Sequence, residues 1–177
     1  MRVRRVVTGQ DNEGKSVFVS VEEVEPLRLP LMPGLEFRRV WGGDEPPSLP
    51  ADGTLPSAPT FFPPAGGYRF TFVILPPDGS VTLPEDLDLE QAVAEVNEKL
   101  PGMMDHMEPD NPGMHTTDTV DLDLLLSGEL DLELDDGAEV HLGPGDCVIQ
   151  NGTRHAWHNR TSEPCTMLSI LVGGTRR

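Results

Sequence analysis

Leucines alternate with other residues through the middle of the chain, and this pattern limits the possible folds more than any other feature of the sequence. The leucines occupy positions 122, 124, 126, 130, 132 and 134, and acids occupy positions 131, 133 and 135. Successive side chains of a β-strand point to opposite faces, so the alternation predicts antiparallel strands. Asp136-Gly137 has the composition of a hairpin turn, and residues 143–146 have that of a second tight turn. The segment is therefore typical of a β protein.

Further short strands are expected on both sides of this segment. They are residues 2–7 and 15–21, which form an N-terminal hairpin, and residues 35–41, 68–75, 140–142 and 166–172. Many short strands separated by turns at close spacing favour a sandwich or barrel over a parallel α/β sheet. One helix is expected, over residues 88–100, where Asp88 and Gln91 form a capping box.

The first third of the chain is expected to wrap around the barrel. From Asp44 to Gly67 the sequence has seven prolines, which exclude a helix or a central strand there. We therefore expect two parts. Residues 1–67 form an N-terminal hairpin and a proline-rich wrapping arm, and residues 68–177 form a β-barrel that includes the helix 88–100.

Charge and composition narrow the possible partners and location. The net charge of −17 disfavours nucleic-acid backbones and anionic membrane surfaces as partners. The longest apolar run, from Phe70 to Leu75, is too short to span a bilayer, and the first residues have no apolar core of the kind found in signal peptides. The two cysteines, Cys147 and Cys165, form no disulfide framework. We expect a cytoplasmic protein with no nucleic-acid or membrane partner.

Two polar clusters on neighbouring strand-like segments predict a metal site. In a β-strand, residues two apart share a face, so His115, Thr117 and Asp121 point the same way, and so do His155 and Trp157. If the two strands meet inside one sandwich, two imidazoles and a carboxylate converge. Such a set suits a first-row metal ion.

The stretch from Gly113 to Asn159 resembles the two sequence motifs of the cupin superfamily, small barrels that usually hold a metal. In the first motif, the His-x-His, the Glu and the closing Gly correspond to residues 115–117, 121 and 128. In the second motif, two glycines, a His and an Asn correspond to residues 145, 152, 155 and 159, with Asn151 where proline is usual. The resemblance implies an all-β double-stranded β-helix, or jelly roll, of a subgroup with a degenerate first motif. It also implies a homodimer, since cupins commonly pair.

The ligand set that the resemblance implies departs from the usual motif. Thr117 stands in place of a histidine, and Asp121 stands in place of a glutamate. What remains is His115, His155 and Asp121, a set of two histidines and one carboxylate. Gln150 could add an amide oxygen as a fourth ligand. The metal would be a divalent ion, with iron, manganese, nickel and zinc left open.

Three functions stay open at this point. The first is a metal-dependent enzyme acting on a small carbonyl, enol or hydroxy-acid substrate, as a lyase, isomerase or cyclase or as a ferrous dioxygenase. In that case either Asp121 or Asp123 would move protons. Asp123 is two residues after Asp121 and so shares its face of the strand. The second is a non-catalytic cupin that binds or senses a small ligand. The third is a structural barrel filled by side chains.

Four further residues are expected to line the substrate pocket. They are Thr117 and Trp157 together with Arg69 and Arg154, the nearby cations that could clamp a substrate carboxylate. The methionine-rich stretch from Met103 to Pro112 is either a loop whose thioethers fill gaps or an apolar rim above the pocket.

Overall fold

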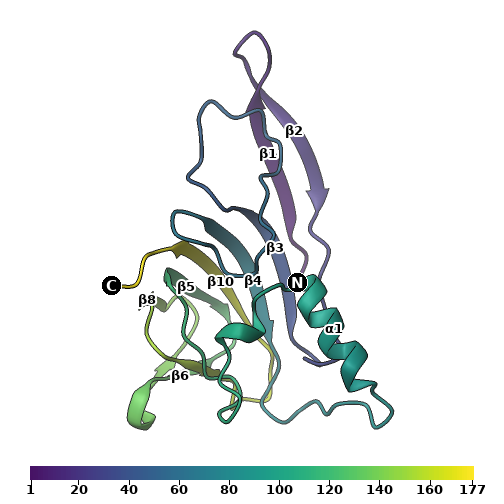
Figure 1. Ribbon diagram of the computed structural model, residues 1–177, viewed down its shortest axis with the longest axis vertical. Helices are drawn as coiled ribbons and strands as arrows, with labels where there is room; N and C mark the ends of the chain where they lie inside the picture. The colour runs from purple at the N-terminus through teal and green to yellow at the C-terminus, as the bar shows by residue number, and fades with distance from the viewer.

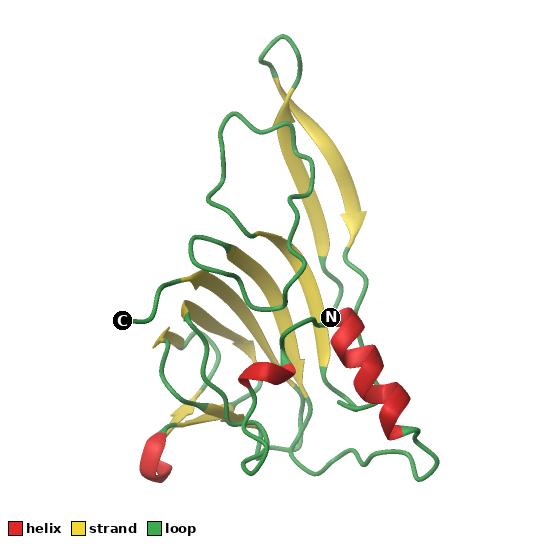
Figure 2. Ribbon diagram, viewed as in Figure 1, coloured by secondary structure: helices red, strands yellow, loops and turns green.

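Two antiparallel sheets that face each other form the body of the protein, as Figures 1 and 2 show for the computed structural model of residues 1–177. The five-stranded sheet has the order β3-β4-β10-β5-β8, and the three-stranded sheet has the order β7-β6-β9. This arrangement confirms the predicted jelly-roll barrel. The strands of the barrel are β3 (Glu36–Gly43), β4 (Tyr68–Leu75), β5 (Thr119–Ser127), β6 (Leu130–Glu133), β7 (Glu139–Leu142), β8 (Cys147–Asn151), β9 (Ala156–His158) and β10 (Cys165–Gly173).

Two leucines of the predicted alternation, Leu130 and Leu132, are buried in an apolar cluster of the barrel. Leu125, Leu130, Leu132 and Leu142 are buried with Cys165 and Met167 in one apolar cluster. On β5, however, the alternation of buried and exposed side chains does not place the leucines of the pattern on the buried face. Asp121 and Asp123 lie on the buried face, whereas Leu126 is exposed. The strand therefore turns carboxyl groups toward the barrel interior.

The N-terminal hairpin stands away from the barrel, as Figure 1 shows. It consists of β1 (Arg4–Gln10) and β2 (Ser16–Glu23), which form a separate two-stranded sheet. At its base the Arg5 guanidinium donates to the Val40 carbonyl at 2.7 Å and lies over the Trp41 ring, so the hairpin is fixed to β3.

The division of the chain at residues 67 and 68 stays a prediction, but the first part is more than a hairpin and an arm. Its strand β3 pairs antiparallel with β4 and forms the edge of the five-stranded sheet. The predicted proline-rich arm has no regular secondary structure between the ends of β3 and β4. Residues 1–67 therefore contribute one strand of the barrel.

A second apolar cluster joins the N-terminal part to the helix. The helix α1 (Leu89–Lys99) begins after Asp88, whose carboxylate accepts a hydrogen bond from the Gln91 N–H at 3.0 Å, as the capping pattern predicts. The cluster comprises Leu29, Phe37, Val96, Leu100 and Met103. The short 3₁₀ helices η1 (Met104–His106) and η2 (Asp135–Gly137) complete the elements. No helix of this chain has the length and apolar character needed to cross a bilayer.

The proline-rich arm closes on the end of β10 through direct backbone contact. Gly66 N–H donates to the Gly173 carbonyl at 3.0 Å, and Gly173 N–H donates to the Gly67 carbonyl at 2.8 Å. A Cβ atom at Gly173 would lie 1.8 Å from the Pro64 carbonyl oxygen, a separation that no side chain can have. Glycine is therefore required there for the arm to pack.

We predict that Gly173→Ala destabilises the protein by about 2 kcal/mol or more, because the clash is with backbone atoms that cannot move aside. Thermal unfolding measures the effect. Gly174→Ala is the matched control, because a Cβ at that position meets nothing closer than 3.6 Å. Equal stability of the two variants would contradict the packing described here.

Candidate functional site

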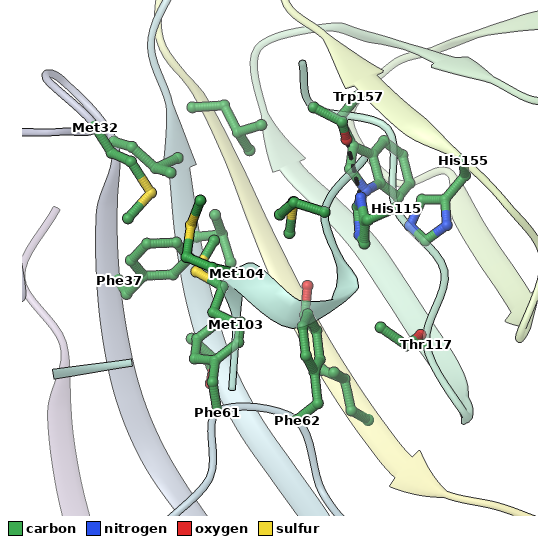
Figure 3. Close-up of a pocket in the computed structure, with 18 of the residues that line it drawn as sticks. Met32, Phe37, Phe61, Phe62, Met103, Met104, His115, Thr117, His155 and Trp157 are labelled. Carbon is green, nitrogen blue, oxygen red and sulfur yellow. Dashed lines mark hydrogen bonds between the residues drawn. The ribbon is translucent and has the colours of Figure 1, made fainter. Parts of the chain in front are cut away.

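A cavity of about 630 Å³ lies between the two sheets, and its lining is polar at one end and apolar at the other. Figure 3 shows the two ends, with His115, His155, Thr117 and Trp157 on one side and Met32, Phe37, Met103 and Met104 on the other. The volume falls within the range of pockets that hold small molecules and cofactors.

Two histidines meet at the polar end because their backbones pair. His115 N–H donates to the His155 carbonyl at 2.9 Å, and His155 N–H donates to the His115 carbonyl at 3.0 Å. The ring centroids are consequently 4.1 Å apart. The structure thus brings the two polar clusters of the sequence together in the cavity.

Backbone carbonyls set the tautomer of both rings. The Nδ1 of His115 lies 2.9 Å from the Gly113 carbonyl, and the Nδ1 of His155 lies 2.9 Å from the Thr153 carbonyl. A carbonyl can only accept, so each Nδ1 carries the proton and each Nε2 keeps its lone pair. A carbonyl partner on the far nitrogen is how metal-binding histidines are oriented in proteins.

Burial keeps both rings neutral. It lowers the pKa of His155 to about 4, and the neighbouring His115 adds to this effect. Burial also lowers the pKa of His115 below its ordinary value. At neutral pH the site therefore contains two uncharged imidazoles whose Nε2 lone pairs are free to bind an acid or a metal ion.

Two carboxyl groups from β5 lie in the same cavity. Asp123 accepts a hydrogen bond from the Ser169 hydroxyl of β10 at 2.6 Å. Burial raises the pKa of Asp123 to about 7 and that of Asp121 to about 6. The Asp121 Oδ1 atom is buried without a hydrogen-bond partner. An unpaired buried acceptor is costly, so its presence points to a ligand atom or a proton that it serves.

Gln150, predicted as a fourth ligand, pairs in register with Asp121 across β5 and β8 but does not line the cavity. Its Oε1 already accepts from the Thr153 hydroxyl at 2.6 Å, and its buried Nε2 has no partner. The oxygen that the prediction assigns to a metal is therefore engaged within the protein.

Of the other predicted pocket residues, Thr117 and Trp157 line the cavity. The Thr117 hydroxyl shares a hydrogen bond of 2.7 Å with the hydroxyl of Thr119, so this threonine is part of the wall. The Trp157 ring meets the His155 ring edge-on, with centroids 5.7 Å apart, and holds that imidazole from the side.

The two arginines predicted as carboxylate clamps have other partners. The guanidinium of Arg69 reaches the cavity wall, but it donates to the carboxylate of Asp44 and to the carbonyls of Gly43 and Thr60. Arg154 does not line the cavity, and it pairs with Glu108 at 2.6 Å and with Asp135 at 3.0 Å. Both guanidinium groups are therefore engaged by acids and carbonyls of the protein, and a carboxylate clamp stays a prediction.

The structure brings the two histidines together but leaves Asp121 farther away. His115, His155 and Asp121 do not offer three ligand atoms within 4.8 Å of one another. The one group that meets this distance is Glu133, Glu139 and His158, on the three-stranded sheet. Its members already have partners, since the His158 Nε2 forms a hydrogen bond of 2.7 Å with the Glu133 carboxylate and Glu139 pairs with Arg160.

Several residues that line the cavity were not predicted from the sequence. Ser169 is a hydroxyl residue between the apolar residues Leu168 and Ile170, a break that could have marked it. Phe37, Phe61 and Phe62 carry no local signal of this kind, because they come from β3 and from the proline-rich arm. Met103 and Met104 line the cavity, as the interpretation of an apolar rim expects.

Comparison with known proteins places the barrel in a family. Residues 106–171 match the family model of the cupin domain. The chain is 46% identical over 48 residues to "Phomopsin biosynthesis cluster protein D" of Diaporthe leptostromiformis, a match that covers 27% of this chain and 25% of that protein. It is 42% identical over 48 residues to "Oryzines biosynthesis cluster protein J" of Aspergillus oryzae, covering 27% of each. The chain thus matches about a quarter of the length of these relatives.

A solved structure supports the fold alone. The cupin domain of Schizosaccharomyces pombe Cnp3 superposes with a TM-score of 0.50 at 7% sequence identity, covering 98% of this chain and 89% of that one. At this identity the likeness concerns the path of the backbone and says nothing about ligands.

We predict that Asp123→Asn stabilises the protein, and more so at pH 8 than at pH 4. The folded carboxyl has its pKa raised from 3.8 to about 7, so folding is penalised progressively as the pH rises through that range. Asparagine removes the charge and keeps the acceptor for Ser169. The gain at pH 8 should be on the order of 2–4 kcal/mol.

Chemical denaturation of chelator-treated protein at the two pH values measures this difference. Asp110→Asn, at an exposed loop position, is the control and should change stability equally little at both. A gain that is the same at pH 4 and pH 8 would show that Asp123 does not titrate in the buried state described.

Proposed function

Because this chain is a member of the cupin superfamily, we propose that it is a metal-dependent enzyme acting on a small oxygen-containing substrate such as a carbonyl compound, an enol or a hydroxy acid. The observation that carries the proposal is the pair of neutral imidazoles, His115 and His155, in a buried cavity next to two carboxyl groups of raised pKa. The biosynthetic context in the names of the partial relatives is consistent with small-molecule chemistry.

The donor atoms of the cavity fit a divalent ion. Two Nε2 lone pairs and the unpaired Oδ1 of Asp121 are nitrogen and oxygen ligands of the kind that iron, manganese, nickel and zinc accept. His115 and His155 would hold the ion, and Asp121, whose carboxylate lies farther away, would have to move closer to serve as the third ligand. When bound, such an ion supplies Lewis acidity toward a substrate oxygen.

The remaining residues suit proton transfer. Asp123 has a pKa of about 7, so it can take up or release a proton at neutral pH, the condition for an efficient general acid or base. Ser169 orients that carboxyl through its 2.6 Å hydrogen bond. An acid of this kind supports lyase, isomerase or cyclase chemistry over the dioxygenase alternative, since those reactions move protons at the substrate.

A non-catalytic cupin that binds or senses a ligand is the second candidate. Two observations favour it: Thr117 stands where a histidine ligand is usual, and the three candidate ligands do not come within 4.8 Å of one another. Such a protein would retain its ligand unchanged.

Metal analysis of protein purified without chelator tests the proposal. We predict close to one equivalent of a first-row metal in the wild type and at least a tenfold loss of metal affinity in His155→Ala, because one of the two imidazoles is removed. His141→Ala is the control, since that exposed histidine pairs with Asp131 on the surface and should leave the metal content unchanged.

Turnover separates the two candidates. With a panel of enols, diketones and hydroxy acids, Asp123→Asn should keep its metal and lose activity by about 100-fold or more. Retention of metal and ligand without turnover in the wild type would support the binding protein instead. A wild type that takes up no metal would rule out the metal-dependent enzyme.

We also infer that the protein forms a homodimer in the cytoplasm. Neither cysteine is paired, Cys147 being exposed and Cys165 buried, which supports a reducing compartment. The two-stranded hairpin contacts the arm near Ala51 and Asp52 but belongs to neither sheet of the barrel, and a ribbon of this size is marginally stable alone. Its strand β2 presents an open edge and exposed Val17, Phe18 and Val21, which a second copy would cover.

Light scattering tests the dimer. We predict twice the chain mass for the wild type and the chain mass for Val21→Glu, because a charge is placed on the apolar face of the hairpin. Val140→Glu, on the similarly exposed strand β7, is the control and should stay dimeric. A monomeric wild type, or equal dissociation of both variants, would contradict the hairpin interface.

A further inference from the structure

The two ends of the cavity come from different parts of the chain. His115, Thr117, Asp121, Asp123, His155 and Trp157 all lie within residues 106–171, the segment that matches the cupin domain. The apolar end is built mostly outside that segment, with Met107 as a member inside it. The residues from outside are Leu31, Met32, Leu35, Phe37, Phe61, Phe62, Met103 and Met104. The apolar end is therefore an addition to the domain, made by the N-terminal part and the loop after α1.

A row of aromatic rings connects the two ends. Phe37 meets Phe61 edge-on with centroids 5.4 Å apart, and Phe61 meets Phe62 edge-on at 4.8 Å. The Phe62 ring in turn stacks toward the His115 ring, with the ring centroids 6.4 Å apart and 24° between the ring planes. The row leads from the β3 side of the cavity to the imidazole pair, and Figure 3 shows Phe62 between the two groups.

The apolar end offers nothing to a polar or charged group. The side chains of Leu31, Leu35, Phe37, Phe61 and Phe62 that line it are hydrophobic. The thioethers of Met32, Met103 and Met104 are at most weak acceptors. Arg69, the one cation of the lining, is already bound to Asp44 and to backbone carbonyls. A hydroxyl or carboxylate placed at this end would lose water without gaining a partner, at a free-energy cost.

We propose that the ligand of this site is an amphiphile, with its oxygen-bearing group at the histidine pair and a hydrocarbon or aryl arm lying along the aromatic row into the methionine-lined end. Methionine side chains adapt to irregular apolar groups, so this end accepts arms of different shape. The proposal rests on the proposed function in that it describes the substrate class of the same cavity. It excludes small, wholly polar molecules such as sugars and short hydroxy acids as the preferred ligands.

Calorimetric titration with simple alcohols tests the apolar arm. For 1-butanol, 1-hexanol and 1-octanol we expect Kd to fall about three- to fourfold for each added methylene, the effect of burying that group. The second probe, 1,8-octanediol, carries the same chain with a hydroxyl at the far end. It should bind about tenfold or more weakly than 1-octanol, because that hydroxyl has no partner in the apolar end.

Two substitutions locate the binding. Leu31→Ser lowers the apolar character of the proposed end and should weaken 1-octanol binding several-fold. Leu89→Ser, on the exposed face of α1 outside the cavity, is the matched control and should bind as the wild type does. His155→Ala should lose metal and still show the dependence of Kd on alcohol chain length. The proposal of an apolar ligand arm and the proposal of a metal centre can therefore be refuted separately.

A Kd that does not depend on chain length would overturn the proposal. So would a diol that binds as tightly as 1-octanol, or a Leu31→Ser variant that binds 1-octanol as the wild type does. Because the wild-type series needs no variant, the proposal can be refuted even if Leu31→Ser does not fold. If the protein takes up no metal while the series holds, the proposed enzyme fails and the ligand class stands.

Discussion

The mutual backbone pairing of His115 and His155 is the contact on which the whole site depends. Two hydrogen bonds of 2.9 and 3.0 Å join segments that are 40 residues apart in the sequence and otherwise irregular at this point. The pairing holds the two ring centroids 4.1 Å apart. The carbonyls of Gly113 and Thr153 bind the Nδ1 atoms, so both Nε2 atoms keep a free lone pair. Without this bridge, neither imidazole would have a defined position relative to the other.

The carboxyl groups of β5 show how the fold tolerates an unfavourable arrangement for the sake of the site. Asp121 and Asp123 are buried side by side on one face, and burial raises both pKa values toward neutrality. A strand selected for stability alone would place its leucines on that face. Conflicts of this kind between local pattern and burial are expected at functional sites. The two apolar clusters supply the stability that offsets them.

Much of the fold was predictable because it depends on local chemistry. The alternation of apolar residues predicted the strands, and the cap at Asp88 predicted the start of α1 to within one residue. The two histidines were also predictable from the motif spacing, although both lie just outside the regular strands β5 and β9. These features depend on neighbours in sequence, which a single sequence displays.

The rest of the site was not predictable because it depends on packing between distant segments. Nothing near Phe62 in the sequence indicates that its ring meets His106 of η1. Likewise, nothing near Arg154 indicates that Glu108 is its partner. The same holds for Gln150, whose side-chain oxygen is engaged by Thr153 three residues later. Each of these contacts depends on which side chains the folded chain brings together, and a single sequence does not display that.

X-ray absorption spectroscopy at the edge of the metal retained by the purified protein tests the central claim most directly. If His115 and His155 share one ion, the spectrum should show scattering from two imidazole rings in the wild type and from one in His155→Ala. A metal surrounded only by oxygen ligands, or a spectrum that is the same in both proteins, would contradict a site built on the paired histidines.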